Sequence, residues 1–235
     1  MKKAFVWFTC CVFALLLMMG TALAEPIAVE SLTDTGTLHE NDDNLTLTYE
    51  LRLPKLRDER ADTINQSAAD WLTYYKNSYI PMVYAENRAA WSEKDIPIEI
   101  TVDYTIKRND GDIVSILYCV SLSKGDAPEE TYFAETYRLS DGKRLMLSDF
   151  TQLQEPTLSV VTREVKRQIQ AQPAGEGAWQ YQENLDENTL AMYLAEDTFY
   201  LAEDGHVVLF VNPSFITNSQ AGLCEFPVEN AVLGK

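Results

Sequence analysis

Side chains that could carry catalysis are scarce in this sequence. Histidine occurs twice, as His39 and His206, and His206 directly follows the turn residue Gly205. Nucleophilic hydrolysis needs a nucleophile, a base and an orienting group, and the sequence contains no Gly-x-Ser-x-Gly elbow or other local pattern that supplies them. We therefore expect His206 to be a solvated residue at a hairpin end, and we predict no catalytic residue.

Metal and phosphate chemistry also lack a motif. The best acidic cluster, residues 40–44 (ENDDN), lacks the alternating ligands and central glycine of an EF-hand loop. Cys-x-x-Cys, His-Glu-x-x-His and Gly-x-x-x-x-Gly-Lys motifs are absent from the sequence. We predict a solvated turn at residues 40–44, with no metal site and no cofactor. Among 36 acidic residues, no catalytic pair of the glycosidase type can be singled out, so a wall-directed hydrolase with an unrecognised site stays an alternative.

Four aromatic residues could form a stacking surface for a sugar: Trp71, Tyr74, Tyr75 and Tyr79. Trp71, Tyr75 and Tyr79 recur at helical spacing, which also fits a stripe that packs into a core. The pattern favours core packing, with the sugar platform as the alternative.

Two cysteines, Cys119 and Cys224, lie outside the N-terminal apolar segment that holds Cys10 and Cys11. In an oxidising compartment such a pair can form a disulfide, which here would close a loop of about 100 residues. The alternative is two separate buried thiols.

The N-terminus has the features of a signal peptide at residues 1–24. Lys2 and Lys3 precede an apolar run over residues 4–19, and Ala22-Leu23-Ala24 places small residues where a signal peptidase cleaves. The run is shorter than the ~20 residues that span a bilayer comfortably. We expect cleavage before Glu25 and a secreted or envelope-associated protein without a membrane span, and an uncleaved anchor is the alternative.

The chain is strongly acidic, with a formal net charge of −17 that becomes −19 when Lys2 and Lys3 leave with the signal peptide. Nucleic acid is excluded as a partner because no basic surface is available to neutralise phosphates. A negative field raises the encounter rate with a basic protein. The alternative is that the charge only keeps an exported protein soluble.

Periodicity predicts an α+β fold, an antiparallel β-sheet built from Asp-Gly hairpins and packed against two or three helices. Residues 45–54 alternate apolar and polar, and hairpin turns are expected at residues 109–111, 140–142 and 203–205. Helical spacing is present in residues 64–79, with Pro81 interrupting, in residues 158–169 between Pro156 and Pro173, and in shorter pieces near residues 84–94 and 186–195.

The register of the first hairpin can be predicted from its apolar face. A three-residue loop with a left-handed Gly111 pairs Ile106 with Val114 and Tyr104 with Ile116, whereas a two-residue loop would scatter the apolar face. This register places Cys119 on the opposite face of the sheet.

Two groups of segments resemble a known family. The segment FYLAEDGHVVLFVNPSFITNSQAG, preceded by DGKRLMLSDF and a helix, resembles the C-terminal half of the extracellular domain of RsiV-type anti-sigma factors. The segments LTYELRLPKL, INQSAADWLTYY and IEITVDYTIKRNDGDIVSILYCVSL resemble its N-terminal module. The same modules accompany PdaC-type polysaccharide deacetylases and occur in exported proteins of unknown function. With residues 1–24 as the signal peptide, the resemblance implies an N-terminal module at 25–125 and a C-terminal module at 126–235, packed as one compact unit.

The resemblance also implies a binding loop. The family's NPYEIAPYAAG-like segment aligns with NPSFITNSQAG, in which Ser214 and Ser219 replace tyrosines and Asn218 replaces a proline. Asn212, Pro213, Phe215 and Asn218 are the candidate ligand-facing residues.

RsiV-type domains bind lysozyme outside the membrane. The sequence and the resemblance together therefore predict an exported, non-catalytic binding module for a cell-envelope ligand, either a basic protein such as lysozyme or a wall glycan. The alternatives are a wall hydrolase and a structural surface module.

Overall fold

The computed structural model describes residues 25–39, 45–88, 96–125, 127–151, 157–171, 185–217, 222–229 and 232–233. The expected signal peptide, the acidic cluster at residues 40–44 and Asn218 lie outside these ranges. Within them, no helix is both long and apolar enough to span a membrane.

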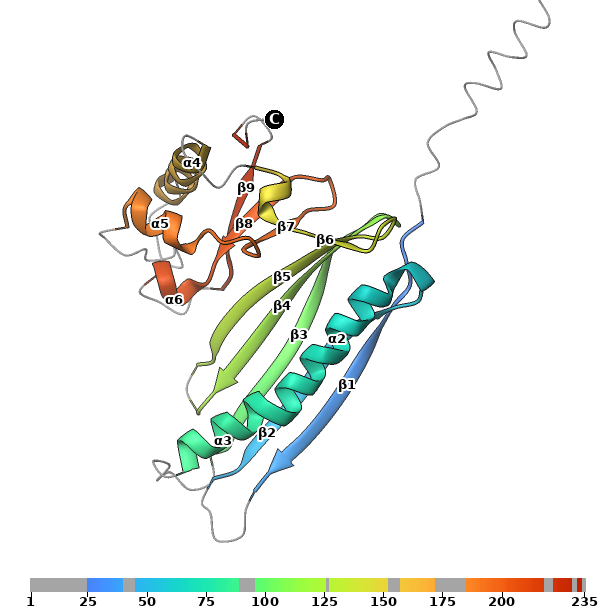
Figure 1. Cartoon of the computed structure of the whole chain (residues 1–235). Coiled ribbons are helices and arrows are strands. Elements are labelled where there is room, and N and C mark those ends of the chain that lie inside the picture. Colours follow the sequence, from blue (N-terminus) through green and yellow to red (C-terminus); the bar gives the residue numbers. More distant parts are fainter. Residues whose placement is uncertain are drawn as a thin grey trace, which may run out of the picture.

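A six-stranded sheet forms the larger part of the molecule, with the strand order β1-β2-β3-β4-β5-β6. Its strands are β1 (Val29–Leu38), β2 (Leu47–Leu56), β3 (Ile98–Asn109), β4 (Ile113–Ser123), β5 (Glu129–Arg138) and β6 (Lys143–Leu145). One long helical segment lies along β1 and β2 (Figure 1). It consists of a 3-10 turn (Glu59–Ala61), α2 (Asp62–Tyr74), a π turn (Tyr75–Tyr79) and α3 (Ile80–Arg88).

Strand β2, which its alternating pattern predicted, contributes apolar side chains to the core beneath this helix. Leu47, Leu51 and Leu53 of β2 are fully buried, and Ile64 and Ala68 of α2 pack in the same cluster. Burial of these leucines fixes which face of β2 points toward the helix.

The sheet is antiparallel except between β2 and β3, which run parallel. The helical segment connects these two strands, and a parallel pair needs such a crossover connection. The edge strand β1 was not predicted, because its sequence VESLTDTGTL carries few apolar residues and only partly buries Val29, Leu32 and Leu38.

The register predicted for the first hairpin is wrong by two residues. Ile106 faces Ile116 and Tyr104 faces Tyr118, with a β-bulge between Ile106 and Arg108. The Asp110 carboxylate accepts the N–H groups of residues 112 and 113 at 3.1 and 2.7 Å, which lengthens the turn. A shift of two residues preserves the faces. Cys119 therefore lies opposite the core face as predicted, and Gly111 is left-handed with φ 86°.

The expected interruption at Pro81 does not occur, because the helical segment continues through Pro81 to Arg88. The π turn immediately precedes this proline, and the N–H of Ile80 bonds to the carbonyl of Tyr75. Proline lacks an N–H and its ring clashes with the carbonyl four residues earlier. A widened turn relieves that clash.

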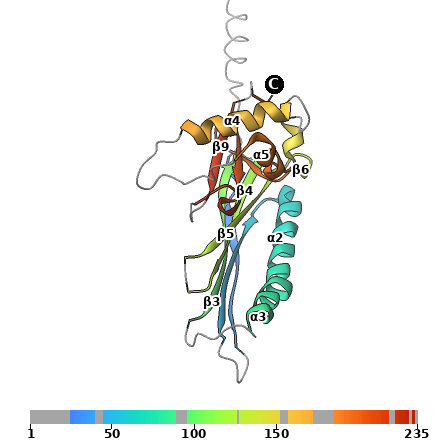
Figure 2. The same ribbon diagram turned by 90° about the vertical axis from the view of Figure 1, so that its left-hand side faces the viewer.

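A second, smaller sheet has the order β7-β8-β9, with strands Phe199–Leu201, Val207–Val211 and Cys224–Val228. Helices α4 (Thr157–Ala171), α5 (Glu187–Tyr193) and α6 (Pro213–Ile216) accompany it, and η3 (Leu147–Asp149) follows β6 (Figure 2). The predicted stripe of α4 is confirmed, since Val161 and Val165 are buried in the cluster that contains Leu209 and Phe226. The turn glycines Gly142 and Gly205 have the positive φ expected of them.

The two sheets share a third apolar cluster, in which Leu117 and Ala134 of the large sheet pack against Tyr200, Val208 and Phe210 of the small one. The expected module boundary at residues 125/126 falls between β4 and β5, which are neighbouring strands of one sheet. Strands β5 and β6 thus belong to the same sheet as β1 to β4.

Both described cysteines are free thiols in this structure, with Cys224 buried and Cys119 half-buried. Burial raises the pKa of Cys119 to about 11 and that of Cys224 to about 12.

The joint between the sheets contains a polar contact whose loss should be measurable. Ser115 is fully buried, and its Oγ accepts the Leu201 N–H at 3.0 Å and lies 2.7 Å from Thr136 Oγ1. Ser115→Ala should lower the free energy of unfolding by about 1–3 kcal/mol, because it leaves a buried N–H without its acceptor. Urea unfolding measures this change, with Ser121→Ala on the more exposed part of β4 as the control. Equal effects of both substitutions would contradict the assignment.

Candidate ligand-binding site

The loop predicted from the sequence has a mainly structural role in its described part. Asn212 Oδ1 accepts the Tyr132 N–H at 2.6 Å, and its Nδ2 donates to the Tyr132 carbonyl at 3.2 Å. These bonds occupy the outer edge of β5, which would otherwise expose unpaired backbone groups. Pro213 is buried at the start of α6. Phe215 is 45% exposed and stacks on Tyr193 with ring centroids 4.9 Å apart.

A buried carboxylate marks a different site. Glu135 of β5 is 2% exposed and points toward α2. Ser67 Oγ lies 3.1 Å from both of its carboxylate oxygens, Trp71 Nε1 donates at 3.3 Å, Tyr137 OH at 3.1 Å and Tyr118 OH at a long 3.5 Å. Four donors from α2, β4 and β5 therefore satisfy a charge whose burial would otherwise be very costly.

The tyrosines of this network are neutral donors. Burial, together with the nearby charge of Glu135, raises the pKa of Tyr137 to about 12 and that of Tyr118 well above its usual range. Both hydroxyls therefore keep their protons at neutral pH.

Arg144 of β6 provides the positive charge. Its Nη1 lies 3.6 Å from Glu135 Oε1, and its side chain is 39% exposed where that of Glu135 is 1% exposed. The Arg144 side chain thus lies between the buried carboxylate and the molecular surface.

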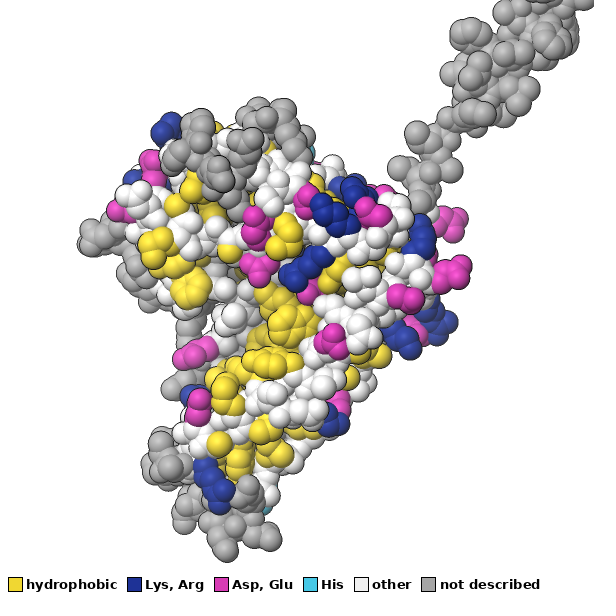
Figure 3. Space-filling view, viewed as in Figure 1, with side chains coloured by type: hydrophobic (Ala, Val, Ile, Leu, Met, Phe, Trp, Pro, Cys, Tyr) yellow, Lys and Arg dark blue, Asp and Glu magenta, His cyan; other side chains and the backbone are white. Residues whose placement is uncertain are grey.

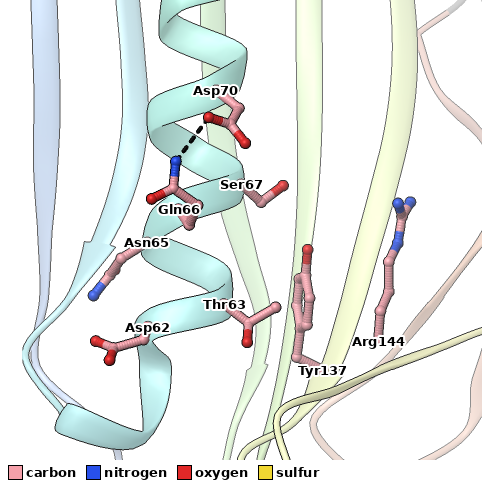
Figure 4. A pocket seen from close by; sticks show the side chains of 8 residues that line it. All are labelled: Asp62, Thr63, Asn65, Gln66, Ser67, Asp70, Tyr137 and Arg144. Carbon is pink, nitrogen blue, oxygen red and sulfur yellow. Dashed lines mark hydrogen bonds between the residues drawn. The ribbon is translucent and has the colours of Figure 1, made fainter.

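A pocket of about 810 Å³ opens beside this network, and we call it the α2 pocket. Figure 4 shows Ser67 and Thr63 of α2 facing Tyr137 and Arg144, while Asp62 and Asn65 point to the other side of the helix. Its full lining is Asp62, Thr63, Asn65, Gln66, Ser67, Asp70, Tyr137 and Arg144.

An aromatic row continues along α2 from the pocket, formed by Trp71, Tyr74, Tyr79 and Phe133. The ring centroids of Trp71 lie 4.9 Å from Phe133 and 5.8 Å from Tyr74, and those of Tyr74 and Tyr79 are 6.4 Å apart. Tyr74 is 45% exposed, whereas the adjoining Tyr75 is 4% exposed. The predicted core stripe is confirmed, since Tyr75 is buried and Trp71 and Tyr79 pack partly buried against the same core. Tyr74, which lies outside that stripe, is exposed. Figure 3 shows apolar side chains gathered between α2 and β5.

The histidines lie outside this site. His39 Nδ1 is 3.2 Å from the Leu45 carbonyl, and the exposed His206 contacts Asp204 at 2.8 Å next to its turn. Neither residue lines the α2 pocket. The described residues contain no group of three or more His, Cys, Asp and Glu side chains placed to hold a metal.

The sequence does carry a signal for this site, in the strand around Glu135. In the strand YFAETYRL, Phe133, Glu135 and Tyr137 alternate onto one face. A single carboxylate between two inward-facing aromatic residues indicates a buried polar network.

Removing the carboxylate tests whether Glu135 organises the site. Glu135→Ala should lower the free energy of unfolding by about 3–5 kcal/mol, because it leaves Arg144 and several buried donors without their acceptor. Glu129→Ala, on the exposed end of the same strand, should change it by less than about 0.5 kcal/mol. Chemical unfolding of both variants gives the comparison, and a near-neutral effect of Glu135→Ala would contradict this role.

No family model and no curated protein matches this sequence. Two solved structures share its overall fold. One is a member of the DUF3298 family from Bacteroides fragilis, at a TM-score of 0.61 and 14% identity over 88% of this chain and 92% of that one. The other is a DUF3298 family protein from Pseudomonas aeruginosa, at a TM-score of 0.54 and 12% identity over 91% and 95%. The chain therefore has the α+β fold found in DUF3298 proteins.

Proposed function

We propose that this protein is an exported, non-catalytic binding module that holds a cell-wall glycan in the α2 pocket and along the aromatic row. The proposal rests on one observation, which is that the α2 pocket and the aromatic row adjoin each other. Ser67 of the pocket and Trp71 of the row donate to the same Glu135 carboxylate.

The dimensions and chemistry suit a sugar. A volume of about 810 Å³ lies within the ~300–1,000 Å³ of typical ligand pockets. The hydroxyls of Ser67 and Tyr137 donate hydrogen bonds to Glu135. The lone pairs of their oxygens can therefore accept a hydrogen bond from a ligand hydroxyl. The rings of Trp71 and Tyr74 offer apolar surface on which the CH face of a sugar can pack.

We propose a non-catalytic role because carboxylates at the site already accept hydrogen bonds from protein side chains. Glu135 already accepts hydrogen bonds from four side chains, so it is held as a structural acceptor and not poised as a base. Asp70 accepts from Gln66 at 2.8 Å on the exposed surface of α2. A hydrolase remains the alternative, with Asp62 and Asp70 as its available acids.

Export is part of the proposal, and it is supported by the features of residues 1–24 and by the resemblance to RsiV-type extracellular domains. A role as a structural surface module is the other alternative, and the exposed Met192 and Phe215 in the smaller part of the molecule favour it.

Paired aromatic substitutions test the glycan site. Soluble wall-glycan fragments titrated into the chain without its signal peptide should release heat, and Tyr74→Ala should weaken binding roughly tenfold, because a stacking ring contributes on the order of 1 kcal/mol beyond its buried area. Phe215→Ala is the matched control, since both rings are 45% exposed. Weakening by Phe215→Ala alone would place the site at the sequence-predicted loop. Absence of heat with the unsubstituted chain would refute glycan binding.

A basic protein such as lysozyme is the second candidate ligand, favoured by the net charge of −17. Calorimetric titration with lysozyme should then give micromolar binding at low salt that weakens at moderate salt, because screening reduces attraction between surface charges. No heat at micromolar concentrations in either buffer would rule this ligand out.

A further inference from the structure

We propose that Arg144 makes the α2 pocket selective for an acidic sugar, one that carries a carboxylate beside its hydroxyl and amide groups. This inference rests on the proposed glycan binding and adds the chemical class of the ligand.

Arg144 differs from other arginines of the protein in how its charge is engaged. Several arginines donate to a carboxylate at 2.5 to 2.8 Å: Arg60, Arg108, Arg138 and Arg167. Arg144 stands at 3.6 Å from Glu135, which is an ion pair beyond hydrogen-bonding distance. Among the residues that the structure describes, none accepts a hydrogen bond from this guanidinium, and its N–H donors can bind an acceptor that enters the pocket.

The buried carboxylate already has donors of its own, because it accepts hydrogen bonds from Ser67, Trp71, Tyr118 and Tyr137. It therefore does not need the N–H groups of Arg144 as hydrogen-bond donors. The Arg144 side chain is 39% exposed and lines the pocket, so a ligand there can reach it. A planar guanidinium held in this way can take a ligand carboxylate with two parallel hydrogen bonds.

The other polar groups of the pocket define the rest of the ligand. Ser67 and Tyr137 present acceptor oxygens opposite Arg144 (Figure 4). Asp70 is engaged by Gln66, and Asp62 points away from Arg144 in the same view. The pocket thus offers a cation next to neutral acceptors, which matches a carboxylate adjacent to hydroxyl or amide donors.

Two sugars that differ by one acidic group provide the test. N-acetylmuramic acid is N-acetylglucosamine with a lactyl ether, so the pair isolates the contribution of a carboxylate. Each is titrated into the ¹⁵N-labelled chain without its signal peptide, and chemical shifts are followed by NMR. The indole N–H of Trp71, which bonds to Glu135, serves as the reporter and is identified by its loss in Trp71→Phe.

We expect the acidic sugar to bind about tenfold more tightly, as one charge-assisted contact provides. Arg144→Gln should abolish this preference and Arg144→Lys should keep part of it. Lys143→Gln should leave the preference intact, because this neighbour makes the same change in net charge but pairs with Asp149 at 2.5 Å and does not line the pocket. Circular dichroism verifies that each variant folds.

The outcomes separate the two proposals. Equal affinity for the two sugars, or a preference that survives in Arg144→Gln, overturns the role of Arg144 while binding itself still supports a glycan site. If neither sugar moves the Trp71 signal, both the glycan site and its selectivity are wrong.

Discussion

Burial of the Glu135 carboxylate is the constraint on which the rest of the site depends. An isolated charge under a helix would destabilise the fold by several kcal/mol, so this position is tolerated only when donors surround it. Those donors come from α2, β4 and β5, with the Arg144 charge from β6. Satisfying one carboxylate therefore sets the rotation of α2 through Ser67 and Trp71 and the placement of the short strand β6.

The position of the helical segment at one side of the large sheet turns this network into a site. The segment lies along β1 and β2 (Figure 1), and Glu135 of β5 and Arg144 of β6 lie at its boundary. The polar pocket and the aromatic row occupy this boundary. The π turn at Tyr75–Tyr79 precedes Pro81, and the helical segment continues past this proline to Arg88.

Local patterns predicted much of the framework and little of the site. The Asp-Gly turns, the stripe of α4 and the leucines of β2 follow from backbone conformation and periodicity, which act over a few residues. The first-hairpin register was missed because the Asp110 side chain lengthens the turn, and β1 was missed because pairing with β2, rather than its own hydrophobicity, makes it a strand. Asn212 bonds to Tyr132, a contact between residues 80 positions apart that local patterns cannot predict.

The sequence by itself determined the α+β class, the acidic surface and the positions of the hairpins, since these depend on composition and short-range spacing. Only the tertiary structure decided where a ligand can bind. Glu135 is separated from Ser67 by 68 residues and from Trp71 by 64, and no periodicity links such distant positions. Their meeting depends on the crossover that brings α2 back over the sheet and on the cost of leaving a buried carboxylate without donors.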